Sequence, residues 1–405
     1  MGYSGVRGGQ EAIAAAERLV EEARYGGSSS WLELEQITER MPLAVDRVMG
    51  EGGLWAPELT ARAIRQSQGD LLEAAQLLRA HRSTLPRLAY STPVSTDELR
   101  VARRISPAFR NPPGGQILGR TLDYVARRLD LTPEPEGRAR DESVRADRVS
   151  AEETGADGVG MDGGGADGAG ADGAGRERPS GRAGATTDTE GPDVPRACGS
   201  GAIPVSSGVV EALRDQGLLT GGPVPADPEP FDITRAPARP GTPRSARLSA
   251  MARAETGSLI HLWYASGRRP EHSGPEIPLE LRRGRLPVRV THPCTGNPVT
   301  VAAAAVTETR TIRGAGLPEE DHTRFDVGYG LCFGDNEAKA LAMAGLDLLV
   351  RRDPETDGLE QKVLIHLDGP ESSGFLEHLK LPHYVDFRST LERIQAVHAT
   401  SGGAR

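Results

Sequence analysis

The sequence contains few cysteines, and their spacing does not suit a cofactor site. Cys198, Cys294 and Cys332 are the three cysteines among 405 residues, and no two of them form a Cys-x-x-Cys pair. This spacing excludes an iron–sulfur cluster or a zinc finger built by this chain alone, because both need clustered thiolates. Isolated cysteines also indicate reduced thiols, as in the cytosol.

Large apolar side chains are scarce as well. Aromatic residues make up 4% of the chain and the hydrophobic types 37%. The deficit is concentrated between residues 132 and 204, whose centre, residues 155–175, is an irregular Ala-Asp-Gly repeat. A calcium-binding β-roll is excluded because the large apolar residue that each turn needs is missing. Such a segment cannot bury enough surface to offset its ordering entropy, so we predict a disordered Gly/Asp/Ala-rich insertion without a function of its own.

The chain lacks a basic excess, a membrane-spanning run and a signal peptide. Its net charge is −9, which argues against nucleic-acid binding. No apolar run reaches the roughly 20 residues of a membrane span, and the N-terminus has no basic stretch followed by an apolar core. We therefore expect a soluble, cytoplasmic protein. A Walker A sequence is also absent, so a nucleotide would not be bound as in a P-loop ATPase.

The first 131 residues are predicted to be mostly helical. Pro57 suits a first helical turn, and Asp70 suits an N-cap. Glycine pairs at 26–27 and 52–53 end two of the apolar stripes. Helical spacing of apolar residues predicts helices at 10–24, at 37–48, from Pro57, at 71–82, and at Leu122, Val125 and Leu129.

Beyond residue 204, a helical pattern at 209–219 gives way to strands. The clearest strand is 325–333, where every odd-numbered residue is large and apolar or aromatic, while Gly328 and Gly330 lie on the opposite face. A helix follows Gly334-Asp335 and is closed by Arg351-Arg352. The other predicted strands are 286–291, 299–306 and 362–367.

These patterns predict an α+β fold with a helical N-terminal part and a mixed β-sheet with helices in the C-terminal part. The expected regions are a helical one at 1–131, the disordered insertion at 132–204, an α+β region at 205–395 and a flexible tail at 396–405.

Two glycine-containing motifs are candidates for binding a phosphate or another ligand. Arg7-Gly8-Gly9 opens directly into a helix, so its amides could cradle a phosphate or only form a tight turn. Gly328 and Gly330 leave room beside their strand, either for a ligand or for a packed helix.

Charged residues form a second group of candidates. Asp46, Arg47 and Glu51 sit near the end of an otherwise apolar-faced helix, where they either form a solvated ion pair or point into a pocket. Asp232 and Arg235 precede a proline-rich stretch, and Arg244 and Arg247 follow it, in what we predict to be a loop. Arginines on a rigid loop suit a polyphosphate, although salt bridges that pin the loop are the alternative.

Two histidines near the C-terminus are candidate metal ligands. Pro382 should hold the preceding residue extended, which presents His383 from a turn, with His378 on the other side of an apolar segment. Two imidazoles can hold a divalent metal if a third ligand arrives from elsewhere, for example from a partner subunit. Asp386 could orient one imidazole.

The motifs together resemble the PhnI family, a core subunit of the bacterial carbon–phosphorus lyase. The motifs that carry the resemblance, in the order of the family, are Val6–Gly9, Leu43–Gly53, Pro113–Gln116, Asp232–Arg235, Arg244–Arg247, Gly328–Gly330 and Gly374–Phe387.

The resemblance implies an enzyme of phosphonate metabolism. With its partner subunits, such a protein displaces adenine from MgATP by methylphosphonate and forms α-D-ribose 1-methylphosphonate 5-triphosphate. Alone, it is a nucleosidase in which water replaces the phosphonate. Asp46, Glu51 and Asp232 are then the carboxylate candidates at the sugar, and Arg47, Arg235, Arg244 and Arg247 the triphosphate anchors.

The resemblance also implies partners and metals. The expected assembly is a homodimer within a hetero-oligomer that includes the iron–sulfur radical subunit, with Mg²⁺ bound to ATP. Zn²⁺ is implied at the partner interface, at His378 and His383. A non-catalytic scaffold that supplies these histidines to the interface is the alternative function. A stand-alone zinc hydrolase is disfavoured because no third ligand or HExxH motif is present.

Overall fold

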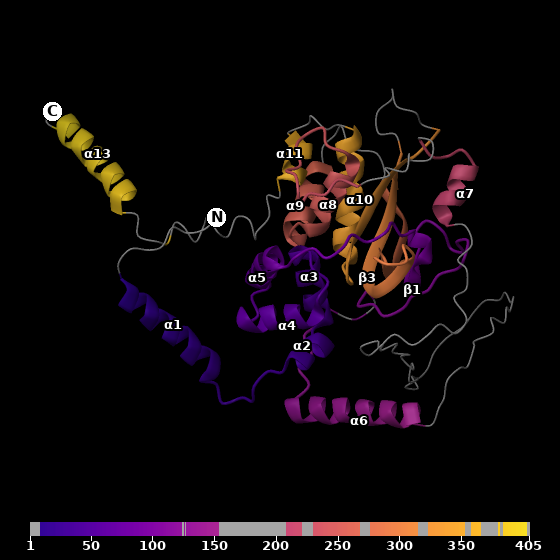
Figure 1. Ribbon diagram of the computed structural model, residues 1–405, viewed down its shortest axis with the longest axis horizontal. Coiled ribbons are helices and arrows are strands. Elements are labelled where there is room, and N and C mark those ends of the chain that lie inside the picture. The colour runs from indigo at the N-terminus through magenta and orange to yellow at the C-terminus, as the bar shows by residue number, and fades with distance from the viewer. Residues whose placement is uncertain are drawn as a thin grey trace, which may run out of the picture. The chain divides into compact units, whose positions relative to one another are not determined.

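The computed structural model describes residues 9–123, 125, 127–153, 208–220, 230–267, 276–314, 323–352, 358–365, 380 and 384–402. The regular elements among these residues are helices and an antiparallel sheet (Figure 1), which confirms the α+β fold class. By its contacts the chain divides into two units, one formed by the residues up to Gly119 and from Gly199, the other by Arg120–Cys198. Among the described helices, none is both long and apolar enough to cross a membrane.

The N-terminal part is helical, as predicted, and its breaks follow from proline, glycine and a capping residue. The stripe predicted at 37–48 is two helices, because Met41 leaves the helical conformation and Pro42 starts a new first turn. Gly53 ends that second helix in the left-handed conformation, with φ 65°. Asp70 caps the fifth helix through the amides of Leu72 and Glu73. The helices are α1 (Gln10–Tyr25), α2 (Leu34–Arg40), α3 (Pro42–Gly52), α4 (Pro57–Gln66) and α5 (Leu71–Thr84).

Helices α2 to α5 share one apolar core. Because each of these helices is apolar on one side only, packing them together removes those sides from water, which is the main stabilising contribution. The buried residues are Ile37, Val45, Val48, Met49, Ala61, Ala63, Ile64, Ala74, Ala75 and Leu78.

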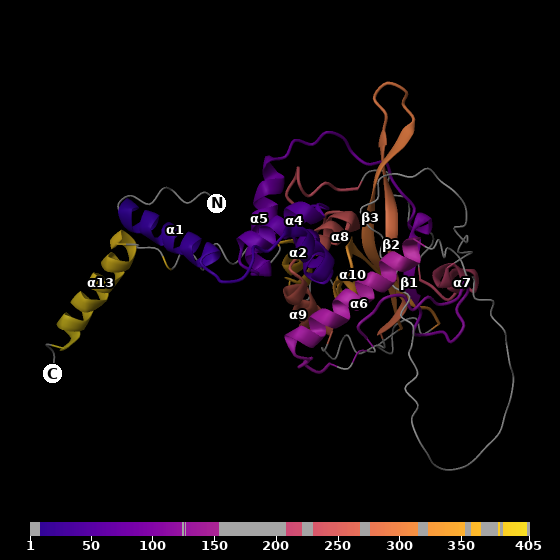
Figure 2. The ribbon, with the colours of Figure 1, turned by 90° about the horizontal axis from the view of Figure 1, so that it is seen from below.

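A four-stranded sheet forms the centre of the C-terminal part. Its strands are β1 (Arg100–Ile105), β2 (Glu276–Thr291), β3 (Pro298–Arg313) and β4 (Asp326–Phe333), in the order β1-β2-β3-β4. Every neighbouring pair is antiparallel, so the mixed sheet that the sequence predicted is corrected to an antiparallel one. The outer ends of β2 and β3 extend beyond their pairing with β1 and β4 as a two-stranded hairpin (Figure 2).

One face of the sheet is covered by α10 (Glu337–Arg352), with α8 (Arg244–Arg253), α9 (Thr256–Gly267) and α11 (Leu359–Leu364) around it (Figure 1). The helix α10 lies directly on β4. A Cβ on Gly328 would fall well inside the van der Waals distance of the Ala344 carbonyl oxygen, and one on Gly330 that of Ala340. The room beside the two glycines is therefore filled by the backbone of a packed helix.

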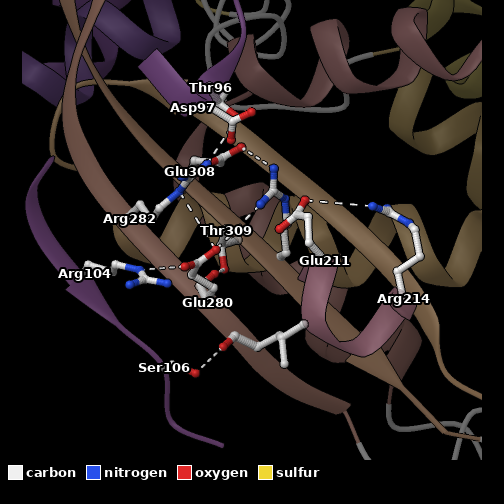
Figure 3. Close-up of polar contacts among 12 residues, drawn as sticks. Thr96, Asp97, Arg104, Ser106, Glu211, Arg214, Glu280, Arg282, Glu308 and Thr309 are labelled. Carbon is white, nitrogen blue, oxygen red and sulfur yellow. Dashed lines mark hydrogen bonds and ion pairs between the residues drawn. The ribbon is translucent and has the colours of Figure 1, made fainter. Parts of the chain in front are cut away.

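The opposite face is apolar at one end, where α7 (Val209–Asp215) packs on it, and charged further along. Figure 3 shows Arg104, Glu280, Arg282 and Glu308 pointing toward one another from β1, β2 and β3. Arg104 Nε lies 2.7 Å from Glu280 Oε1, and Arg282 Nε lies 2.9 Å from Glu308 Oε2. The two terminal nitrogens of Arg310 each lie 3.6 Å from a carboxylate oxygen, one of Glu280 and one of Glu308. The buried Arg104 and Arg282 and the partly buried Arg310 therefore pair with two buried glutamates within the sheet, which makes this face a structural network.

Several predicted elements differ from the observed ones. The strand predicted at 362–367 is α11 as far as Leu364, because its apolar residues Leu359, Val363 and Leu364 are buried at helical spacing. The helix predicted from Leu122 to Leu129 is not present among the described residues of that stretch.

Helix α6 and the end of helix α13 lie where the sequence predicted no regular structure. Residues Glu134–Glu153 form α6, whose Glu, Arg and Ala content favours a helix even without an apolar face. The rest of the predicted insertion, residues 154–204, lies outside the described residues. Helix α13 (Tyr384–Gly402) continues into the predicted tail.

The close contact of α10 with β4 predicts that a single added methyl group on the strand destabilises the fold. We expect Gly330→Ala to lower the free energy of unfolding by about 1–3 kcal/mol, since either the helix or the strand must move. Urea denaturation measures the change. Gly267→Ala, at the end of α9, is the control because its Cβ would meet no atom within 4 Å. A Gly330→Ala variant as stable as Gly267→Ala would contradict direct packing of the two backbones.

Candidate active site

Helix α3 presents three charged candidates at its junction with α8, α9 and α10. Glu51 is fully buried, and its Oε1 accepts hydrogen bonds from Arg47 Nε at 2.9 Å and from the Thr256 amide at 3.0 Å. Arg47 Nη2 also lies 2.6 Å from Glu255, at the start of α9. These contacts join the end of α3 to α9. Glu51 Oε2 is buried without a hydrogen-bond partner in the described part of the chain.

Asp46 holds the turn between β4 and α10. Its Oδ2 accepts a hydrogen bond from the Asp335 amide at 2.8 Å, and its side chain packs against Gly334, where a Cβ would collide with it. Gly334 has φ 73°, a conformation that glycine adopts without strain. Nearby, burial raises the pKa of Cys332 to about 11, with Lys339 opposing the rise and Asp46 adding to it. The thiol is therefore protonated at neutral pH and is a poor nucleophile.

Asp232 lies in the loop before α8 and is partly exposed. Its Oδ1 accepts hydrogen bonds from the amide and the hydroxyl of Thr234, at 2.9 and 2.5 Å. Its Oδ2 lies 2.5 Å from Arg87 Nη1. Desolvation by burial opposes the shift, but these hydrogen bonds and the Arg87 charge outweigh it and lower the pKa of Asp232 to about 2. The carboxylate is thus ionised at neutral pH.

Tyr90 connects two arginines at this loop. The guanidinium carbons of Arg87 and Arg235 lie 4.8 and 5.0 Å from the centroid of its ring. The Arg235 side chain is 69% exposed, and its Nε lies as far as 4.0 Å from Asp232 Oδ2. Arg235 is therefore a weakly held cation at the surface. The loop before α8 and the segment after α5 therefore bring an ionised carboxylate, two cations and an aromatic ring together in one exposed region.

Arg244 and Arg247 lie on helix α8, not on a loop as predicted. The prolines before them end at the N-cap position, Pro243, so the helix begins at Arg244. Arg244 forms an ion pair with Asp347 of α10, and Arg247 lies 2.8 Å from Glu360 of α11. Both arginines are therefore engaged in ion pairs that hold α8 against its neighbours.

The remaining candidates are only partly described. Gly9 is the N-cap of α1 in the left-handed conformation, with φ 72°, while Arg7 and Gly8 lie outside the described residues. The histidines His378 and His383 also lie outside them. Within the described segments, no three His, Cys, Asp or Glu side chains cluster as metal ligands.

Sequence reasoning did not identify Arg87 as a partner of Asp232. The two residues are 145 positions apart, and no spacing rule connects them. What the structure brings together is therefore two groups. Asp46, Arg47 and Glu51 lie around the end of α3, and Asp232, Arg235, Arg87 and Tyr90 form the exposed loop cluster.

The burial of Glu51 predicts a cost for removing its charge. We expect Glu51→Gln to lower the free energy of unfolding by about 1–3 kcal/mol, because Arg47 and the Thr256 amide lose a charged acceptor. Glu58→Gln is the matched control, since Glu58 pairs with Arg62 at 3.4 Å on the exposed side of α4 and should cost at most about 0.5 kcal/mol. Equal urea midpoints for the two variants would contradict this role of Glu51.

The low pKa of Asp232 predicts a pH-dependent contribution to stability. Because the folded pKa of about 2 lies below the unfolded value of about 3.9, the ionised carboxylate stabilises the fold above roughly pH 4. That contribution is lost as the pH falls toward 2. The difference in unfolding free energy between wild type and Asp232→Asn should therefore shrink from pH 5 to pH 2. In an Arg87→Gln background the same difference should be smaller at pH 5. A pH-independent difference in the wild-type background would contradict the assignment.

The whole chain matches one protein family, described as "Bacterial phosphonate metabolism protein (PhnI)", over residues 2–401. A protein of Stutzerimonas stutzeri named as a candidate C-P lyase subunit, HtxH, is 40% identical over 98% of this chain and 95% of its own length. Two proteins named alpha-D-ribose 1-methylphosphonate 5-triphosphate synthase subunit PhnI are also similar. The protein from Rhizobium meliloti is 32% identical over 100% of this chain and 96% of its own length. The protein from Escherichia coli is 34% identical over 97% of this chain and 97% of its own length. The chain is thus a member of the PhnI family, as its motifs indicated.

Proposed function

We propose that this chain is a catalytic subunit that, with partner subunits, forms α-D-ribose 1-methylphosphonate 5-triphosphate from MgATP and methylphosphonate. The names of two full-length relatives, which call them subunits of the synthase of that product, support the proposal. The observation in the structure that supports it best is the exposed loop cluster. There the ionised carboxylate of Asp232 lies beside Arg87, Arg235 and the ring of Tyr90.

The chemistry needs a carboxylate beside a sugar that becomes cationic. A phosphonate oxygen forms a bond to C1′ while the bond from C1′ to adenine breaks, and the electron pair of that bond leaves with the base. The transition state resembles an oxocarbenium ion, which a nearby carboxylate stabilises. Asp232 suits this role because its low pKa keeps it ionised while it remains partly exposed.

The other two carboxylate candidates suit supporting roles better. Glu51 is fully buried and fixed by Arg47 and the Thr256 amide. Asp46 is occupied by the Asp335 amide in the turn before α10. Both would orient the elements that surround the site, whereas Asp232 would face the substrate.

The triphosphate needs cations, and Mg²⁺ bound to ATP supplies part of that charge. Of the four arginines predicted as anchors, Arg235 is the most exposed. Arg47, Arg244 and Arg247 would act mainly through the carboxylates that they already pair with. In the absence of partners, water in place of the phosphonate would make the chain a nucleosidase on ATP or GTP.

The proposal includes an assembly. The relatives are named as subunits, so we propose a cytoplasmic homodimer within a hetero-oligomer that contains the iron–sulfur radical subunit. His378 and His383 would contribute to a zinc site at the interface with a partner.

A non-catalytic scaffold is the second candidate function. The observation that favours it is that Arg47, Arg244 and Arg247 are all engaged in internal ion pairs. The first joins α3 to the start of α9, and the other two join α8 to α10 and to α11. In that case the reacting groups would belong to other subunits.

Replacement of Asp232 tests the catalytic proposal. Asp232→Asn keeps the size of the side chain but removes the charge, so we expect kcat for adenine release from MgATP to fall by about 100-fold. The assay measures free adenine with the partner subunits and methylphosphonate, and also with the chain alone. Asp215→Asn, at the exposed end of α7, is the matched control and should leave kcat unchanged.

Two results would contradict the proposal. Unchanged turnover of Asp232→Asn would remove Asp232 from the site. Product formation only when partners are present, and equally with every carboxylate variant of this chain, would favour the scaffold.

A further inference from the structure

Three arginines from two helices converge on the backbone at the end of α3. Arg79 Nε donates to the Glu51 carbonyl oxygen at 2.8 Å, and its Nη2 donates to the Arg253 carbonyl oxygen at 2.7 Å. Arg82 Nη1 lies 3.4 Å from the carbonyl oxygen of Gly53. Arg79 and Arg82 belong to the last turns of α5, and Arg253 is the last residue of α8. We call these three residues the α5–α8 arginine cluster.

Gly53 is what allows the guanidinium groups to come this close. A Cβ at this position would collide with Arg82 Nη1 and would lie 3.1 Å from Arg253 Nε. The residue also has a positive φ of 65°, which a side chain would strain. The backbone therefore provides a small, side-chain-free surface against which two guanidinium groups from different helices lie side by side.

The charge of Arg82 is not neutralised within the described chain. Its hydrogen-bond partner among the described residues is the Gly53 carbonyl, and the charges that act on its guanidinium group are those of two other arginines, Arg79 and Arg87. Burial lowers the pKa of Arg82, and the neighbouring charges of Arg79 and Arg87 lower it further. Holding like charges together costs free energy, and a bound anion would offset that cost.

A purely structural role explains part of this arrangement. Arginines in the last turn of a helix interact favourably with its dipole, and those at the end of α3 satisfy carbonyl groups that the helix leaves open. That role needs one arginine at each helix end. It does not explain why guanidinium groups from α5 and α8 meet at a single glycine.

We propose that the α5–α8 arginine cluster binds an oligophosphate, with Arg82 as the contacting residue and Arg79 and Arg253 beside it. Guanidinium groups bind phosphate oxygens through paired, charge-assisted hydrogen bonds. The identification of this anion as the triphosphate of the nucleotide substrate rests on the function proposed above. Arg87 connects the two regions, since its charge acts on Arg82 and its side chain pairs with Asp232.

Isothermal titration of the purified full-length chain with sodium tripolyphosphate tests the proposal without a base or a sugar. We expect Arg82→Gln to weaken binding by about 10- to 100-fold, because a charge-assisted hydrogen bond is lost. Arg82→Lys should give an intermediate affinity, since the charge stays but the planar fork is lost. Arg62→Gln removes the same charge from an exposed pair on α4 and should leave the affinity within about twofold.

The outcomes separate this proposal from the function. No tripolyphosphate binding by the wild type, or equal affinities of Arg82→Gln and Arg62→Gln, would overturn the site and leave only the capping role. With the partner subunits, Arg82→Gln should raise KM for MgATP about 10-fold or more with little change in kcat. An unchanged KM would overturn the assignment to the substrate, even where adenine is still displaced. If no variant displaces adenine, the proposed function fails, and the titration still decides the anion site.

Discussion

The direct packing of α10 on the backbone of β4 is the constraint on which the rest of the C-terminal part depends. Gly328 and Gly330 leave no side chain between the strand and the carbonyl groups of Ala344 and Ala340. At this short distance Asp347 of α10 reaches the Tyr329 amide of β4 at 3.0 Å. A polar group in the core is thereby paired instead of being left buried and unsatisfied, which would cost more than the hydrogen bond contributes.

Helix α10 in turn positions the elements of the candidate site through contacts near both of its ends. Asp347 also pairs with Arg244, which fixes the first turn of α8 and therefore the direction in which α8 runs to Arg253. At the start of α10, Asn336 donates to the Thr256 hydroxyl at 3.1 Å, and the amide of Thr256 is bound by Glu51. The end of α3, the end of α8 and the start of α9 are thus placed by one buried helix. A shift of α10 would move the arginine cluster and the acidic residues together.

The fold was largely predictable where local patterns decide it. The alternation in 325–333 predicted β4, and the apolar spacing after Gly334 predicted α10, because both elements bury a face that the sequence makes visible. The glycines on β4 were consistent with a ligand or a helix, and only the three-dimensional arrangement shows which of the two lies there. Arg244 was placed in a loop because of the prolines before it, although a proline at the N-cap is compatible with a helix that starts one residue later.

The site was less predictable because it depends on pairs that are distant in the sequence. Asp232 and Arg87 are 145 positions apart, and Arg79 meets the Arg253 carbonyl across 174 positions. Neither pair leaves a spacing signal. Motifs that resemble those of a family therefore identified the family correctly, while the role of each arginine depends on which partner the fold places beside it.

That partner determines what an arginine can still do. Arg47, Arg244 and Arg247 face carboxylates, so binding a phosphate there would require breaking an existing ion pair, and their charge is largely cancelled. Arg82 is held by a carbonyl oxygen, which orients the guanidinium group but leaves its full positive charge. A dipole fixes position without neutralising charge, which is the preorganisation that binding of an anion needs. Arg82 lies outside the family motifs and contacts a backbone carbonyl, whereas the motif arginines Arg47, Arg244 and Arg247 contact carboxylates. Arg82 is therefore better placed to hold a phosphate than they are.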